Sequence, residues 1–169
     1  MWLESFLNHN IFYPMKRPSR IERLRIVLNS WFPPGSFSMT LFGTVYTKSS
    51  YAAENLGKEG SEDNTHEMIH IKQAQSCWDC WLSFYFLYLC QWLFNLPLIT
   101  IDRRAPYKFI PFEIEAYKHQ REPEYIKDIA TEWKEIRKLK MSERKRLAKM
   151  YYKEYRKTTR FTDFIKEHM

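Results

Sequence analysis

The sequence predicts a mainly α-helical (α+β) fold, in which a helical core carries a small N-terminal β-strand or hairpin element. Only 4 glycines and 8 prolines occur among 169 residues, which favours helices over a turn-rich β fold. Apolar residues make up 44% of the chain and aromatic residues 17%, which argues for a hydrophobic core and against disorder. We therefore expect a single domain over residues 1–169, with a core over 38–140 and a basic helical extension over 141–169.

Three elements are expected before residue 64. Ser19 can cap a short helix. The apolar residues of that helix are Ile21, Leu24, Val27 and Leu28. Residues 38–47 are β-prone and predict a strand, with Gly43 as a bulge. Residues 49–63 are polar, so we expect a loop of about fifteen residues that serves as a lid or is mobile.

A run without charged residues extends from Cys80 to Ile101 and is dominated by Trp, Leu, Phe and Tyr. Its twenty-two residues are enough to cross a bilayer. Polar residues within the run and its tyrosines favour a buried or membrane-surface helix, with a true span as the alternative. Arg103 and Arg104 follow and suit a cytoplasmic flank.

Further helices are predicted downstream. Pro111 is a good first residue for a helix, which Pro123 ends or restarts. Residues 125–139 have the spacing of a helix with one face towards the core. The apolar residues of that face are Ile126, Ile129, Trp133 and Ile136. Ser142 can cap another helix, and Thr162 starts a last short turn.

The formal net charge of +7 is concentrated near the C-terminus. From Lys134 to Lys157, eleven Lys and Arg stand against three Glu, a net charge of +8. Such a cluster is most often a solvated helix face, and its functional alternatives are contact with an anionic membrane surface or with nucleic acid. Membrane contact fits better, because the aromatic run from Trp81 to Phe94 can rest among lipid headgroups, and nucleic acid is the less favoured partner.

The three cysteines, Cys77, Cys80 and Cys90, are an odd set and not a disulfide framework, which favours a reducing compartment. We expect the Cys77–Cys80 pair to be buried structural thiols rather than a metal or redox pair. The first residues do not form a basic region followed by an apolar stretch, so we expect no secretory signal there. The expected localisation is cytoplasmic, with membrane association as an addition.

The most informative motif is His66-Glu67-Met68-Ile69-His70, which places two imidazoles four residues apart. On an α-helix, positions i and i+4 lie on one face, so both rings can reach one metal ion. Zinc accepts neutral imidazole readily, and Glu67 stands where it can take a proton from a metal-activated water. The alternative is that Asn64 and Glu67 form a capping box at the start of a helix ending near Trp78, with the histidines as surface residues.

A catalytic zinc site usually has three protein ligands and a water, and residues 111–117 supply the third ligand. Glu113 and Glu115 are two residues apart, so on a helix they point about 200° away from each other and only one can face the metal. Glu113 shares its face with Tyr117 and with Ala116, whose small size allows close packing against the histidine helix. We expect Glu113 as the ligand and Tyr117 as a supporting residue, with Glu115 as the runner-up ligand or as a hydrogen-bond partner of a histidine.

With these residues the sequence resembles the zincin metallopeptidases, specifically the gluzincin group, in which a helical His-Glu-x-x-His motif is completed by a downstream glutamate. Glu113-Ile-Glu-Ala116 matches the Glu-x-x-Ala part of that group's second motif, and Tyr117 stands where the group has aspartate. A closer likeness is to small zincin-like proteins of Bacteroides-type bacteria. This likeness covers roughly residues 38–140 and is carried by His66 to Gln73, Trp81 to Phe94 and Phe112 to Tyr117.

The resemblance implies a zincin-like helical core, Zn²⁺ held by His66, His70 and Glu113, and Glu67 as the general base of peptide-bond hydrolysis. We therefore expect a zinc metallopeptidase acting on a peptide or protein substrate. The strand at residues 38–47 is the expected edge to which an extended substrate adds as a further strand. Two alternatives stay open: a non-catalytic protein that binds an anionic membrane surface or nucleic acid through its basic helices, and a zincin-like fold kept for structure.

Overall fold

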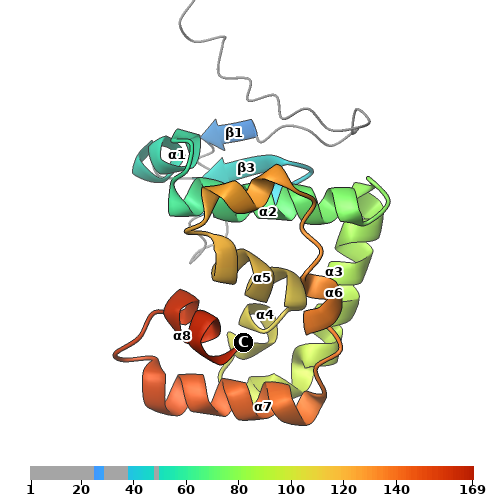
Figure 1. Ribbon diagram of the computed structural model, residues 1–169, viewed down its shortest axis with the longest axis vertical. Coiled ribbons are helices and arrows are strands. Elements are labelled where there is room, and N and C mark those ends of the chain that lie inside the picture. The colour runs from blue at the N-terminus through green and yellow to red at the C-terminus, as the bar shows by residue number, and fades with distance from the viewer. Residues whose placement is uncertain (1–24, 29–37, 48–49) are drawn as a thin grey trace, which may run out of the picture.

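The computed structural model describes residues 25–28, 38–47 and 50–169. The predicted fold class is confirmed, because the described chain is mainly helical with a small sheet at one end (Figure 1). The α-helices are α1 (Ser50–Gly57), α2 (Glu62–Ser76), α3 (Trp81–Asn95), α4 (Ala105–Lys108), α5 (Pro111–His119), α6 (Trp133–Ile136), α7 (Met141–Met150) and α8 (Phe161–His168). The connecting turns are the 3₁₀ segments η1 (Leu96–Thr100) and η2 (Pro123–Lys127) and the π-helical turn η3 (Tyr151–Tyr155).

The sheet has the strand order β1-β3-β2. Its strands are β1 (Arg25–Leu28), β2 (Ser38–Leu41) and β3 (Thr44–Thr47). β2 and β3 are antiparallel and are joined by Phe42 and Gly43, whose φ angles of 50° and 71° suit a tight two-residue hairpin turn. The predicted strand or hairpin element is therefore a hairpin, and Gly43 provides its turn rather than a bulge in one continuous strand.

Two further predictions near the sheet are wrong. In the segment after Ser19 that was predicted as a short helix, residues 25–28 form strand β1, which pairs in parallel with β3. The rest of that segment lies outside the described residues. The loop predicted over residues 49–63 contains α1, which lies against β1 and α2. Ala53, Glu54 and Leu56 are good helix formers, and the buried Leu56 anchors the helix.

α2 carries the two histidines and begins earlier than predicted. Ser61 caps it, because the Ser61 hydroxyl oxygen accepts a hydrogen bond from the Asn64 N–H at 3.1 Å. Asn64 lies inside the first turn, and its side chain donates to the carbonyl oxygen of Leu56 at 2.6 Å. The capping box of Asn64 and Glu67 is thus not formed, and Glu67 lies in the second turn, beside the histidines.

α5 packs against α2 in the middle of the domain (Figure 1). As predicted, Pro111 is its first residue, where the missing N–H costs no helical hydrogen bond. Residues 111–116 are all buried, because α2, α6 and α8 surround the helix. Ile69 of α2 and Ala116 of α5 belong to one apolar cluster, so the small Ala116 lies where the two helices meet.

α3 and η1 run along one side of the domain (Figure 1). Within α3 only Phe84 and Asn95 are buried, so the helix lies at the surface. Of the predicted buried or membrane-surface helix, the buried form is therefore wrong, and the membrane-surface form stays a prediction. Trp81–Thr100 is a 20-residue segment long and apolar enough to cross a membrane, and only 17% of its apolar window is buried.

The residues predicted as a C-terminal extension belong to the main core. Leu147, Tyr151 and Phe164 pack in one cluster with Leu98 and Phe109. α7 begins one residue before the predicted cap Ser142, and the predicted last turn is helix α8. α7, η3 and α8 therefore share an apolar core with η1 and α5.

The long helix predicted over residues 125–139 is interrupted. It is divided into η2 and α6, and Ile129, predicted to face the core, is 47% exposed. The backbone N–H of Glu132 donates to Oε1 of the buried Glu115 at 2.6 Å. A buried carboxylate on α5 thus holds the connection between η2 and α6.

The described cysteines are free. Cys77 is buried at the end of α2, as predicted, whereas Cys80 is only half-buried and Cys90 is exposed.

Candidate metal centre

Three of the predicted site residues come together where α2 meets α5. His66 and His70 lie one turn apart on α2, and Glu113 lies in the first turn of α5. One ligand atom from each residue lies within 4.8 Å of the others. The described part of the chain therefore contains a group of two imidazoles and one carboxylate that can hold a metal ion.

The distances between the ligand atoms match a tetrahedral zinc site. Zn–N and Zn–O bonds of about 2.0–2.2 Å place neighbouring ligand atoms about 3.3–3.6 Å apart at tetrahedral angles. The Nε2 atoms of His66 and His70 are 3.2 Å apart. Glu113 Oε2 lies 3.6 Å from His66 Nε2, and Glu113 Oε1 lies 3.4 Å from His70 Nε2. Each histidine faces a different oxygen of Glu113, so the carboxylate would have to rotate for one oxygen to bind the same ion as both imidazoles.

Gln73 fixes the tautomer of His70. Its amide nitrogen donates to the carbonyl oxygen of Phe112 at 2.9 Å and to Glu115 Oε2 at 2.6 Å, which identifies the nitrogen and leaves its oxygen as an acceptor. That oxygen lies 2.8 Å from His70 Nδ1, so Nδ1 must carry the proton. In a neutral ring, the Nε2 lone pair is then available for a metal.

Gln120 acts on His66 in the same way. Its amide nitrogen donates to Thr162 Oγ1 at 2.9 Å and to Glu62 Oε2 at 3.1 Å. Its oxygen lies 3.1 Å from His66 Nδ1 and accepts the ring proton. Both neutral rings therefore direct Nε2 lone pairs at each other, an arrangement that is repulsive unless a proton or a metal ion lies between them.

Glu113 keeps one oxygen for a ligand. Tyr88 of α3 donates a hydrogen bond to Oε1 at 2.8 Å. Oε2 is buried and has no hydrogen-bond partner. A buried carboxylate oxygen without a partner is costly, and a bound cation at this point would satisfy it.

Glu115, the runner-up ligand, points away from the histidines. Its carboxylate accepts hydrogen bonds from Gln73 Nε2, the Tyr125 hydroxyl at 2.7 Å and the backbone N–H of Glu132 at 2.6 Å. Burial raises the pKa of this carboxyl, although these hydrogen bonds oppose the shift. Glu115 therefore contacts Gln73, which in turn contacts His70, whereas the alternative prediction was a direct hydrogen bond between Glu115 and a histidine.

The electrostatics of the centre favour positive charge between the ligand atoms. Burial alone opposes ionisation of both His70 and Glu113. Their mutual attraction outweighs burial, so the pKa of His70 is raised to about 9 and the pKa of Glu113 is held well below its usual range. A proton on the imidazole or a divalent cation can supply that positive charge.

The centre remains open on one side. The side chains of His66 and His70 keep 12% and 10% exposure, whereas Glu113 keeps 2%. Glu67, half-buried, contributes its negative charge to raising the pKa of His70, although burial and Glu113 have larger effects. The predicted base and the two imidazoles therefore lie on the partly solvent-accessible side of α2.

Two residues close to the motif have different roles. The Tyr117 ring packs edge-on against the His66 ring, with centroids 4.8 Å apart, and so helps to fix its position. His119 lies elsewhere, because its Nδ1 contacts Glu122 at 2.5 Å and its Nε2 contacts Glu132 at 2.6 Å. Both ring nitrogens of His119 are thus used in ion pairs outside the centre.

Sequence reasoning missed the roles of Gln73, Gln120 and Tyr88. Gln73 lies three residues after His70, which is the spacing of neighbours on one helical face, so its contact had a local signal. Gln120 is 54 residues from His66, and Tyr88 is 25 residues from Glu113, so neither contact has a local signal.

Comparisons of the chain with protein-family models, with curated proteins and with solved structures found no match.

Proposed function

We propose that this protein is a zinc-dependent hydrolase that cleaves peptide bonds. The observation that carries the proposal is the convergence of two Nε2 atoms 3.2 Å apart with the carboxylate of Glu113, whose Oε2 has no hydrogen-bond partner and lies 3.6 Å from His66 Nε2. His66, His70 and Glu113 would hold Zn²⁺. The ion would lower the pKa of a bound water towards 7 and polarise the carbonyl group of a substrate.

The remaining roles belong to residues of this chain. Gln73 and Gln120 hold the imidazoles in the Nδ1–H form, so that neither ring must rotate or change tautomer when the metal binds. Glu67 would accept the proton of the attacking water and pass it to the leaving amine. Tyr88 would hold Glu113 so that Oε2 faces the ion.

The second candidate function is a metal site that serves only the stability of the fold. Structural zinc sites are usually closed by four protein ligands. The group in the described chain has three members, and both histidines retain some exposure. These two features favour a centre with a position left for water, and therefore favour hydrolysis.

Elemental analysis tests the metal and chooses its carboxylate ligand. We expect about one zinc per chain in the wild type, loss of zinc in Glu113→Gln, and retention of zinc in the matched variant Glu115→Gln. Retention in Glu113→Gln together with loss in Glu115→Gln would contradict the proposed ligand set. Absence of zinc and other divalent metals from the wild type after reconstitution would overturn the metal centre itself.

Activity then separates an enzyme from a structural site. The purified zinc protein is incubated with a mixed peptide library, and new N-termini are identified by mass spectrometry. We expect Glu67→Gln to keep its zinc and to lose at least 100-fold in cleavage rate, in the range usual for loss of a general base. Cleavage that continues unchanged in Glu67→Gln would show that another group, or a contaminant, performs the reaction.

A further inference from the structure

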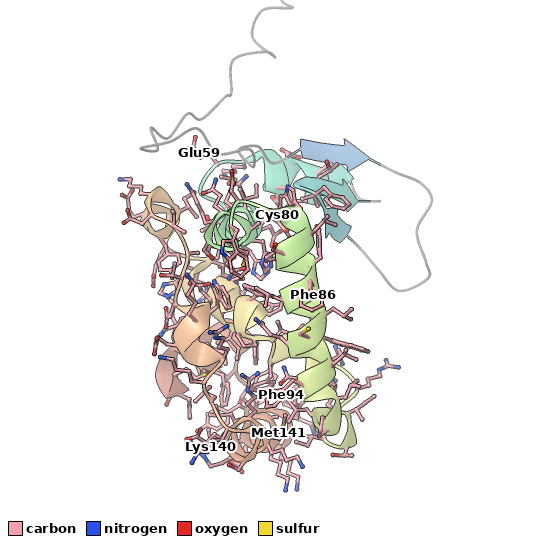
Figure 2. All side chains as sticks on the ribbon, turned by 90° about the vertical axis from the view of Figure 1, so that its right-hand side faces the viewer. Glu59, Cys80, Phe86, Phe94, Lys140 and Met141 are labelled. Carbon is pink, nitrogen blue, oxygen red and sulfur yellow. The ribbon has the colours of Figure 1, made fainter. Side chains whose placement is uncertain are left out.

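α3 and η1 expose a continuous apolar surface. Leu82, Phe86, Leu89 and Leu93 follow one another at the spacing of a single helical face. Leu82 is 72% exposed, Phe86 66% and Leu89 52%. Phe94 and Ile99 extend this surface, which we call the α3 stripe, towards the C-terminal end of the segment. Figure 2 faces this side of the domain, with α3 passing from Cys80 beyond Phe86 to Phe94.

The opposite face of α3 is fixed to the domain by polar and aromatic contacts. Tyr88 donates to Glu113, and the Tyr85 hydroxyl accepts a hydrogen bond from the Phe42 N–H at 2.8 Å. Near the helix end, Asn95 donates to the carbonyl oxygen of Pro106 at 3.2 Å. α3 thus has one side committed to the protein and one apolar side that no described residue covers.

Basic residues lie at the C-terminal end of the α3 stripe. Arg103 and Arg104 are exposed and follow η1 after Ile101 and Asp102, and the carboxylate of Asp102 lies 3.8 Å from Arg104 Nε. The basic helix α7 crosses this end, because the guanidinium of Arg144 lies 5.2 Å from the centre of the Phe94 ring. Figure 2 shows Lys140, just before α7, below Phe94. An apolar helix face with cations at its edge has the composition of a surface that binds anionic lipid.

We propose that the α3 stripe docks side-on onto an anionic lipid surface. Its exposed leucine and phenylalanine side chains enter the boundary between headgroups and acyl chains, and the arginines at its end contact lipid phosphates. Trp92 of α3, which is 37% exposed, suits this depth, because its ring combines an apolar body with a polar group. The proposal concerns a surface separate from the metal ligands and does not depend on peptidase activity.

A transmembrane position fits the structure less well than side-on docking. A span would require lipid on all sides of α3, whereas Tyr88 and Asn95 bond to the rest of the domain. It would also bring the buried cation Arg144, which donates to Asn95 Oδ1 at 3.0 Å, to membrane depth. Side-on docking leaves these contacts unchanged.

A second copy of the chain is also a weaker occupant. Each copy carries a net charge of +7, so two copies repel each other at long range, whereas an anionic surface attracts the chain. Charge complementarity therefore selects lipid over self-association.

Vesicle flotation of the full-length chain tests the proposal. We expect the protein to float with vesicles of equimolar phosphatidylcholine and phosphatidylglycerol, and to bind vesicles of phosphatidylcholine alone at least ~10-fold less tightly. Phe86→Glu and Leu89→Glu should each weaken binding to the anionic vesicles by ~10-fold or more, because an acid replaces an apolar side chain at the contact. Ile129→Glu is the matched control, since Ile129 is 47% exposed but lies outside the α3 stripe, and it should bind as the wild type does.

Circular dichroism and elution volume establish that each variant is folded and report its oligomeric state. Binding by Phe86→Glu and Leu89→Glu at wild-type strength would overturn the proposal, as would a folded wild type that binds neither vesicle. A wild-type dimer that becomes monomeric in Phe86→Glu, without vesicle binding, would identify a second copy as the occupant instead. Resistance of the bound protein to extraction with alkaline carbonate would indicate a span and would also overturn side-on docking.

Discussion

Replacing Gln120 by leucine should weaken zinc binding without removing a metal ligand. The Gln120 oxygen is the acceptor that keeps the Nδ1 proton of His66 in place, at 3.1 Å. Loss of a hydrogen-bond partner behind a metal-binding imidazole typically costs 10- to 100-fold in metal affinity. That loss corresponds to about 1.4–2.8 kcal/mol of binding free energy.

The structure offers a matched control in Thr162→Val. Gln120 donates to Thr162 Oγ1 at 2.9 Å through its amide nitrogen, so this substitution removes a contact of the same glutamine and leaves its oxygen facing His66. Valine has nearly the shape of threonine, and Gln120 retains its second acceptor, Glu62. We expect Thr162→Val to change zinc affinity by less than about threefold, because the hydrogen bond between Gln120 and His66 stays in place.

Zinc affinity is measured by competition with a chromophoric chelator at neutral pH. Circular dichroism in the absence of zinc shows whether Gln120→Leu and Thr162→Val remain folded. Equal affinities of Gln120→Leu and the wild type would refute the argument that Gln120 prepares His66 for the metal. Equal losses in both variants would attribute the effect to packing around Gln120 rather than to the His66 hydrogen bond.

Three other predictions concern stability. Removal of zinc by a chelator should lower the melting temperature by roughly 10 °C, because free zinc at a thousand times its dissociation constant adds about 4 kcal/mol to the free energy of unfolding. Calorimetry with and without chelator measures this shift, and an unchanged melting temperature would contradict the prediction. Arg144→Met should lower the unfolding free energy, measured in urea, by about 3 kcal/mol, because Asn95 Oδ1 and several buried carbonyl oxygens lose their donor. The control Arg146→Met, at an exposed position, should lower it by less than about 0.5 kcal/mol. The Glu132 pKa is lowered from 4.5 to about 2, chiefly by its hydrogen bond with His119, which outweighs burial. A carboxyl group whose pKa is lower in the folded than in the unfolded state stabilises the fold at pH values above its unfolded pKa. This contribution, about 1 kcal/mol after solvent screening, should disappear as the pH falls from 5 to 2. Glu132→Gln should lose less unfolding free energy over the same interval, and an identical loss would contradict the assignment.

The parts of the site that the sequence could predict depend on short-range geometry. A spacing of four residues places His66 and His70 on one face of any helix, and Pro111 marks the start of the helix that carries Glu113. The opposite directions of Glu113 and Glu115 also follow from helix geometry, and the structure agrees with the choice of Glu113 as the acid nearer the histidines. These inferences needed only one helical turn.

The parts that could not be predicted depend on the distant residues that each segment meets. Phe42 and Gly43 form a hairpin turn because both adopt positive φ, which a strand propensity over the whole segment does not reveal. Ile129 has the spacing of a core residue, yet the chain there leaves the helix because Glu115 holds the Glu132 N–H. Gln120 becomes a partner of His66 only because α2 and α5 are packed together.

The distribution of charge around the centre gives an independent reason to expect a divalent ion rather than a shared proton. Glu113 is buried and ionised, and the charge of Glu67 also acts on His70, while the two glutamines hold the proton of each imidazole on Nδ1 and leave the Nε2 atoms as the place for added positive charge. One proton between His66 and His70 would balance only one of these two negative charges and would leave Glu113 Oε2 without a partner. A divalent cation would balance both charges, occupy both lone pairs and bind the free oxygen. The charge and the donor set of the site therefore favour a divalent cation over a histidine–glutamate ion pair, in line with the proposed function.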